Sequence, residues 1–167
     1  MIERTVIFVR GKFDIMLITT KKYKLKINDD LVACMNSYKQ LNLKDKEAGG
    51  ILIGYITNDN NIIIEYITKP FDKDIRKRFS FIRRDNKHEK ILNSIWKNNG
   101  EVHTYVGEWH THPEDYPIFS CIDKKNWINL GKKIKPQKEF YINIIVGNKE
   151  LRIWEYDIRN EKIERIR

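Results

Sequence analysis

The stretch GEWHTHPEDYPIFSCID, residues 107–123, contains side chains that can bind a metal ion. His110 and His112 are separated by one residue, and alternate residues of a strand point to the same side. Pro113 cannot donate a hydrogen bond to a neighbouring strand, so it turns the chain out of the sheet. The two imidazoles would therefore project together and could bind Zn²⁺ at about 2.0 to 2.1 Å from each nitrogen.

A catalytic zinc ion needs a third protein ligand and one open position for water. Asp123 is a suitable ligand, and the ten residues between it and His112 let the chain loop back. Two simpler interpretations remain open. A lone His-x-His is often a chance surface pair, and Ser120 with Asp123 matches the S-x-x-D pattern of a helix start. A helical first turn could also hold Asp123 rigidly beside a metal.

Hydrolysis at a metal also requires a general base near the bound water. Glu47, Glu108 and Glu114 are the acidic candidates, and chemistry alone leaves Glu47 and Glu108 open. His103 has the opposite strand parity to the His110–His112 pair, so we expect a structural role for it. His88 falls within a predicted helix, where we expect it to be solvated or structural.

Apolar periodicity and turn residues predict an α+β fold, with a mixed, largely antiparallel sheet flanked by about three helices. Residues 1–167 are interpreted as one domain: N-terminal strands in 1–28, a core with the metal site in 29–157, and a C-terminal strand in 158–167. The predicted helices are 29–43, 85–100 and 120–134. The predicted strands are 6–9, 14–19, 23–27, 51–56, 62–67, 79–83, 102–110, 140–148, 150–159 and 162–167.

Composition narrows the class of protein. Hydrophobic residues make up 41% and charged residues 33%, as in folded water-soluble domains. All apolar runs are shorter than the roughly 18 to 20 residues that a membrane span needs. The apolar stretch at the N-terminus is too short for a secretory signal. We therefore expect a cytoplasmic protein without a membrane partner. Cys34 and Cys121 are expected to be unpaired thiols in the core, and Cys121 lacks the second soft ligand of a thiolate zinc site.

The net charge is +9, and basic residues concentrate between Lys69 and Lys90. Arg83 and Arg84 are candidate substrate-binding residues, because with Arg76 and Arg78 they could recognise an acidic partner surface. The alternative, slightly favoured, is a solvated basic edge that blocks unwanted strand pairing. Nucleic acid is not favoured as a partner, because acidic residues are interleaved and no nucleic-acid motif accompanies the charge.

The combined pattern resembles the JAMM (MPN+) motif of the JAB metallopeptidases. It consists of Glu47, then His110-Thr-His112-Pro113, then Ser120-x-x-Asp123. The resemblance covers roughly residues 30 to 157 and includes the glycine pair after Glu47. It implies the JAB/MPN, cytidine-deaminase-like fold. It also implies one Zn²⁺ per chain held by His110, His112 and Asp123, with Glu47 as general base and Ser120 as oxyanion donor.

Within that family, DIRKRFSFIRRDNKH and GEWHTHPEDYP resemble the JAB peptidase of CBASS antiphage operons, which removes a nucleotidyltransferase from its conjugates. The resemblance implies an isopeptidase that cuts after the C-terminus of a ubiquitin-like modifier or similar conjugate. Ubiquitin-activating-like and ubiquitin-conjugating-like enzymes of the same operon would be its partners. The alternatives are a non-catalytic JAB-like module that binds a ubiquitin-like partner, a nucleic-acid accessory protein, and a peptidase that trims a free C-terminal residue.

Overall fold

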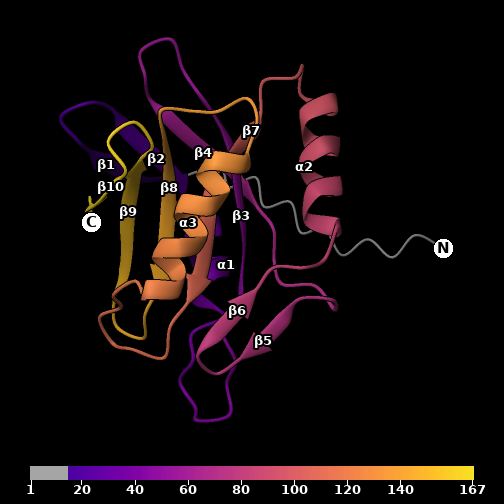
Figure 1. Ribbon diagram of the computed structural model, residues 1–167, viewed down its shortest axis with the longest axis vertical. Coiled ribbons are helices and arrows are strands. Elements are labelled where there is room, and N and C mark those ends of the chain that lie inside the picture. The colour runs from indigo at the N-terminus through magenta and orange to yellow at the C-terminus, as the bar shows by residue number, and fades with distance from the viewer. Residues whose placement is uncertain (1–14) are drawn as a thin grey trace.

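The computed structural model describes residues 15–167, in which one curled sheet of eight strands carries three helices (Figure 1). The β2–β4 and β7–β8 pairs are parallel and the other neighbours are antiparallel. The predicted α+β class is therefore confirmed, whereas the strand predicted at 6–9 lies outside the described residues. In sheet order the strands are β1 (Ile15–Thr19), β2 (Lys24–Asn28), β4 (Ile62–Ile67), β3 (Gly49–Ile56), β7 (Thr104–Thr111), β8 (Phe140–Val146), β9 (Leu151–Asp157) and β10 (Lys162–Arg165).

Helices cover both faces of the sheet. The helix α1 (Asp29–Asn36) lies behind it in Figure 1, and α2 (Lys87–Asn98) and α3 (Cys121–Lys133) lie in front. Because the central strands β3, β7 and β8 are covered on both sides, they are almost wholly buried and rich in apolar residues. Alternation along β7 then sends Trp109 into the core beneath α1, while the His110 ring lies 6.4 Å from that of Trp127 on α3.

The first helix is shorter than the predicted 29–43, since α1 ends at Asn36. Leu31 and Met35 are buried as the helical spacing predicts, but Leu41 is exposed. Beyond the helix the chain turns so that the Gln40 side chain becomes buried. There the Gln40 amide donates to the Arg78 carbonyl over 2.8 Å and accepts from the Thr111 hydroxyl over 3.1 Å. A polar contact with the sheet therefore overrides the local helical pattern.

The basic segment before α2 forms a separate hairpin of β5 (Ile75–Lys77) and β6 (Ser80–Ile82), where the sequence predicted a single strand near 79–83. In Figure 1 this β5–β6 hairpin lies below the large sheet, near the end of β7 and the start of α3.

No helix within residues 15–167 is long and apolar enough to cross a membrane. Cys34 and Cys121 are both free thiols, as expected, but the prediction that they lie in the core is wrong, because Cys34 is partly exposed and Cys121 is exposed.

Candidate metal centre

The two histidines lie together where β7 ends. His110 is the penultimate residue of the strand, and the backbone N–H of His112 donates to the Val146 carbonyl of β8 over 3.0 Å. The chain thus stays in line with the sheet through His112, and the two side chains share one face. Their Nε2 atoms are 3.0 Å apart, and the residues are only 8% and 7% exposed.

Asp123 approaches the pair from the first turn of α3. Its Oδ1 lies 3.3 Å from His110 Nε2, and its Oδ2 lies 3.4 Å from His112 Nε2. Ser120 is the N-cap residue of α3 and forms a reciprocal capping box with Asp123. The helix-start interpretation of S-x-x-D is thus confirmed, and the same turn directs Asp123 at the histidines. The three ligand atoms of His110, His112 and Asp123 lie within 4.8 Å of one another.

The spacing of these atoms suits a single zinc ion. Tetrahedral ligation at 2.0 to 2.1 Å separates neighbouring ligand atoms by roughly 3.3 Å. The two histidine nitrogens are 3.0 Å apart, and each lies 3.3 to 3.4 Å from a different Asp123 oxygen, so one ligand atom from each residue fits within 4.8 Å. Burial by itself raises the pKa of Asp123, but hydrogen bonds with His110, His112 and Ser120 outweigh it and hold the pKa below its ordinary value. The carboxylate is therefore held in the ionised form that metal ligation requires.

Glu47 enters the site from the residues before β3. Gly49 pairs with His110, the Thr111 N–H donates to the Ala48 carbonyl over 2.8 Å, and the same antiparallel register places Glu47 opposite His112. Glu47 is 4% exposed, and no hydrogen bond within residues 15–167 engages its carboxylate. Burial raises its pKa to about 8 against the lowering effect of His112. A buried carboxyl group with this pKa can exchange a proton near neutral pH.

The two glycines after Glu47 allow β3 to approach its neighbours closely, as their position predicts. A Cβ atom on Gly50 would lie 2.0 Å from the Thr68 carbonyl oxygen. A Cβ atom on Gly49 would lie 2.6 Å from the Trp109 carbonyl oxygen and 2.6 Å from the Phe81 ring. A larger residue at Gly49 would therefore push the segment that follows Glu47 away from β7 and the hairpin, and a larger residue at Gly50 would push it away from Thr68.

The other two acidic candidates have different surroundings. Glu108 shares the His110 face, but its Oε1 lies 2.9 Å from both Nε and Nη2 of Arg83. Glu114 is half exposed and accepts the Ile118 N–H over 3.0 Å, with its other oxygen 3.9 Å from His112 Nδ1. Of the three, Glu47 alone is buried with an unbonded carboxylate among the described residues.

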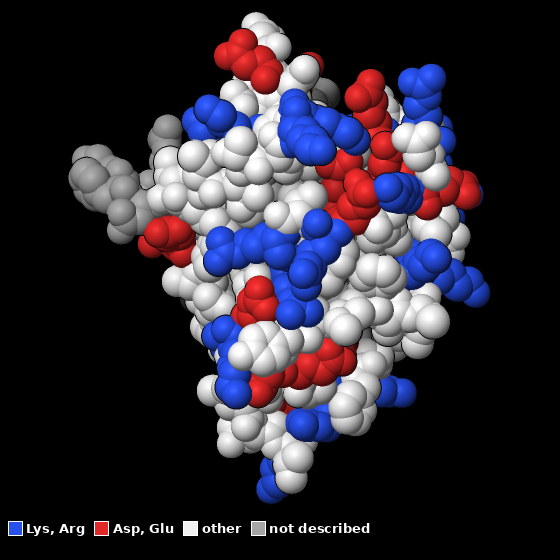
Figure 2. All heavy atoms as spheres, turned by 90° about the vertical axis from the view of Figure 1, so that its left-hand side faces the viewer, with Lys and Arg blue, Asp and Glu red and all other residues white. Residues whose placement is uncertain are grey.

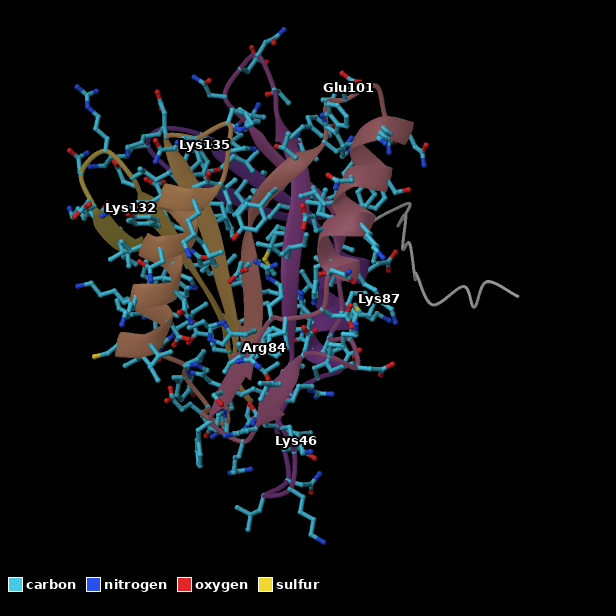
Figure 3. All side chains as sticks on the ribbon, turned by 45° about the vertical axis from the view of Figure 1, so that its right-hand side comes forward. Lys46, Arg84, Lys87, Glu101, Lys132 and Lys135 are labelled. Carbon is cyan, nitrogen blue, oxygen red and sulfur yellow. The ribbon has the colours of Figure 1, made fainter. Side chains whose placement is uncertain are left out.

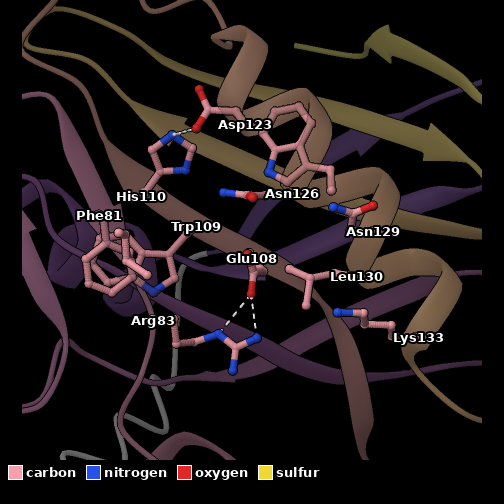
Figure 4. Close-up of a pocket in the computed structure, with 12 residues that line it drawn as sticks. Phe81, Arg83, Glu108, Trp109, His110, Asp123, Asn126, Asn129, Leu130 and Lys133 are labelled. Atoms are coloured by element: carbon pink, nitrogen blue, oxygen red, sulfur yellow. Dashed lines mark hydrogen bonds and ion pairs between the residues drawn. The ribbon is translucent and has the colours of Figure 1, made fainter.

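A groove of about 250 Å³ begins at the metal centre (Figure 4). His110 and Asp123 lie at one end and Lys133 at the other, with α3 along one side. Phe81 and Arg83 of the hairpin segment line the groove across from α3, and the Arg83–Glu108 pair lies between these walls. Sequence reasoning did not find this groove, because its walls come from segments about 40 residues apart in the chain.

The basic segment is not a uniformly solvated edge, so that interpretation is wrong for three of its arginines. Arg83 pairs with Glu108, Arg76 Nε donates to the Glu47 carbonyl over 2.8 Å, and Arg78 donates to a loop carbonyl over 2.8 Å. Arg84 is exposed and labelled in Figure 3. On the face drawn in Figure 2, basic side chains are interspersed with acidic ones.

The remaining two histidines are structural. His103 Nε2 lies 2.8 Å from Glu65 Oε2. The parity argument that set it apart does not hold across β7, because the β3–β7 register shifts at Val106 and reverses the alternation. His88 has no exposed surface and bonds to Thr68 and Asp74, so the solvated interpretation is wrong for it.

Comparisons with known proteins identify the family of this chain and agree with its fold. A protein from Escherichia coli (strain TW11681) named CD-NTase/cGAS isopeptidase is 35% identical over 75% of this chain and 77% of its own length. A protein of the same name from Vibrio cholerae is 33% identical over 72% of this chain and 74% of its own length. A shorter match, 33% identical over 41% of this chain and 42% of the relative, is named probable metalloprotease, from Sinorhizobium fredii.

A solution structure of a Desulfitobacterium hafniense protein has a similar fold, with a TM-score of 0.56 over 83% of this chain and 87% of that one, at 15% identity. The family described as prokaryotic homologs of the JAB domain matches residues 37–157, which include Glu47, both histidines, Ser120 and Asp123. This match spans most of the chain, and the chain therefore belongs to the prokaryotic JAB-domain family.

Proposed function

We propose that this protein is a zinc-dependent isopeptidase or peptidase that hydrolyses the bond after the C-terminus of a ubiquitin-like modifier or similar protein conjugate. The names of its relatives support isopeptidase or metalloprotease activity in this family. The observation that carries the zinc chemistry is the set of three ligand atoms within 4.8 Å, beside a buried, unbonded Glu47.

In this proposal His110, His112 and Asp123 hold one zinc ion per chain. When bound, the zinc would lower the pKa of a water molecule to about 7 and polarise the substrate carbonyl. Glu47 accepts a proton from the attacking water and returns it to the leaving amine nitrogen. Burial raises the pKa of Glu47, whereas the positive charge of a bound zinc ion would lower it, so the carboxylate would be ionised and able to accept a proton when the site is filled.

Ser120 is proposed to donate a hydrogen bond to the oxyanion that forms at the carbonyl. Its Oγ already accepts the Asp123 backbone N–H over 3.1 Å. A hydroxyl group carries one donor and two acceptor positions, so the proton of Ser120 stays available for a substrate oxygen. The helix start fixes that oxygen in place before the reaction, which is the condition for efficient oxyanion stabilisation.

The groove suggests how the substrate binds. β6 pairs only with β5 among the described strands, so its other edge can accept an extended peptide by strand addition. Phe81 and Ile82 of β6 line the groove that leads to His110 and Asp123. A thin C-terminal tail lying along this edge would deliver its last carbonyl to the metal centre.

The conjugate is proposed to be of the CD-NTase class, because three relatives at 33 to 35% identity are named CD-NTase/cGAS isopeptidase. The protein would then act in the bacterial cytoplasm, in an antiphage system. Ubiquitin-activating-like and ubiquitin-conjugating-like enzymes would build the conjugate that it removes.

The test begins with zinc measured by elemental analysis in the wild type and in a His110→Ala/His112→Ala variant. About one zinc per chain in the wild type and none in the folded variant is expected. Glu47→Gln should keep the zinc and stop cleavage of a modifier joined through its C-terminus to a nucleotidyltransferase, whereas Glu108→Gln should still cut. A wild type that takes up no zinc would refute the proposal and favour a non-catalytic binding module.

A further inference from the structure

A chain of three buried polar side chains links the large sheet to the β5–β6 hairpin. His88 Nδ1 lies 2.6 Å from Thr68 Oγ1, and His88 Nε2 lies 2.8 Å from Asp74 Oδ2. The exposed fractions are 0% for His88, 2% for Thr68 and 8% for Asp74. None of the three lines the groove or belongs to the metal centre. Buried polar chains are costly unless every member is bonded, so this one requires an explanation.

The protons of this chain can be assigned from its bonds. Thr68 Oγ1 accepts the Ile51 N–H over 2.9 Å, so its own proton is donated to His88 Nδ1. His88 is then the Nε2–H tautomer, which donates to Asp74. Burial lowers the pKa of His88 despite the neighbouring Asp74 charge, which keeps the imidazole neutral as this pattern requires. The side-chain polar atoms of Thr68, His88 and Asp74 therefore all have hydrogen-bond partners.

Asp74 closes the base of the hairpin. Its carboxylate accepts the backbone N–H of Phe71 over 2.8 Å, before β5. It also accepts the N–H groups of Arg84 and Asp85 over 2.8 and 2.9 Å, after β6. At the other end of these three linked side chains, Thr68 accepts the Ile51 N–H of β3. Its backbone carbonyl accepts the indole N–H of Trp109, on β7, over 2.9 Å. His88 is the connection between these two anchored ends.

The hairpin in turn holds the residues proposed to act on substrate. The Glu47 N–H donates to the Lys77 carbonyl over 2.8 Å, and Arg76 Nε donates to the Glu47 carbonyl over 2.8 Å. Both polar groups of the Glu47 backbone are therefore bonded to β5. Phe81 packs against Gly49, and Arg83 pairs with Glu108 in the groove. Displacement of the hairpin would move the Glu47 backbone and one wall of the groove together.

We infer that His88 is a positioning residue, which fixes the β5–β6 hairpin and through it the Glu47 backbone relative to the metal centre. For its effect on cleavage this inference rests on the proposed function, but its effect on the hairpin does not. None of the three proposed metal ligands bonds to Thr68, His88 or Asp74, so the zinc content should not depend on His88.

The experiment compares His88→Leu with His103→Leu. His103 is the matched control, because it is also a buried histidine bonded to a carboxylate, that of Glu65 on β4, and it lies just before β7, at the end opposite the metal centre. Amide hydrogen exchange is followed in residues 45–50 and 71–86, with β8 and β9 as the internal reference. His88→Leu should speed exchange in these segments by roughly tenfold or more, the effect of a lost buried hydrogen bond. It should also slow cleavage while zinc content stays at the wild-type value.

His88→Gln serves as the rescue variant, since its amide can still donate to Asp74, and it should restore most of the hairpin protection. Equal exchange in His88→Leu and His103→Leu, or no recovery with glutamine, would overturn the inference. If His88→Leu does not fold, Thr68→Val provides the same comparison with little change in volume. A protein that cleaves nothing would refute the proposed function, and the exchange result would still decide the role of His88.

Discussion

The Ser120 backbone N–H donates to Asp123 Oδ2 over 2.6 Å, and the Asp123 backbone N–H donates to Ser120 Oγ over 3.1 Å. The same carboxylate faces His110 and His112 at 3.3 and 3.4 Å. Helix capping and ligand orientation are therefore carried by one pair of residues. A substitution in this pair changes helix stability and the metal centre together, so experiments on it need variants that separate the two effects.

Ser120→Ala should lower the rate of cleavage by roughly 10²- to 10³-fold, the usual effect of losing an oxyanion donor. It should also cost about 1 kcal/mol of folding stability through the lost cap. Ser120→Gly separates the two effects, because glycine at an N-cap costs only a few tenths of a kcal/mol but has no hydroxyl proton to donate. We expect it to recover stability in urea unfolding without recovering activity, with zinc content measured alongside. Full activity in Ser120→Ala would exclude the oxyanion role.

Zinc should stabilise the folded wild type, because the ligands converge only in the folded state. At a free zinc concentration 100-fold above the dissociation constant, the gain in free energy of unfolding is about 2.7 kcal/mol. Thermal unfolding with and without added zinc measures this. In Asp123→Asn, the stabilisation by zinc should be much smaller. Asp115→Asn is the control, because Asp115 is an exposed acid whose substitution should leave the stabilisation by zinc unchanged. A gain that persists without His110, His112 and Asp123 would place the zinc elsewhere.

Arg83 and Arg84 are expected to respond differently to charge reversal. Arg83→Glu places a second carboxylate beside Glu108 and should cost roughly 1 to 3 kcal/mol of stability. Arg84→Glu changes an exposed side chain and should stay within about 0.5 kcal/mol. The double variant Arg83→Glu/Glu108→Arg restores the opposite charges and should recover most of the loss. If Arg84 binds an acidic surface of the substrate, Arg84→Glu should raise KM and leave stability unchanged. An unaltered KM would show that Arg84 does not contact the substrate.

Lys138 should make stability depend on pH in the alkaline range. Burial lowers its pKa from 10.5 to about 8. Below pH 8 the ammonium is charged in the folded and unfolded states, and its burial destabilises the fold. Between pH 8 and 10.5 the folded state releases its proton first, so stability rises with pH. Lys138→Met removes this penalty and also the hydrogen bond from Lys138 Nζ to Thr104 Oγ1, so its stability relative to the wild type should fall as the pH rises from 8 to 10.5. A constant difference in urea unfolding across this range would contradict the prediction.

Strong local patterns in the sequence predicted much of the fold. Alternation at the end of β7 places His110 and His112 on one face, and the helix-start pattern locates Ser120 at the N-cap of α3. Both features depend on a few neighbouring residues, which is why they can be read from the chain. The position of Glu47 opposite His112 depends instead on the β3–β7 register, which joins residues more than 60 positions apart. The family resemblance indicated it where local chemistry did not.

Features that arise from tertiary contacts were missed. The register shift at Val106 leaves no signal in the amino acid types, so strand parity failed for His103. The charge of the segment before α2 is typical of a solvated surface. Asp74 is nevertheless buried there, because its carboxylate accepts hydrogen bonds from three backbone N–H groups and from His88. Charged residues can be buried when backbone donors surround them, and composition does not reveal such donors.

The position of β7 within the sheet has a consequence for how the two halves of the polypeptide stay together. Every earlier strand of the large sheet lies on one side of β7, and every later strand lies on the other. His110 and His112 end the first half, whereas Asp123 begins the second. A metal ion bound by all three would act as a non-covalent crosslink across this seam, in addition to the strand pairing of β7 with β8.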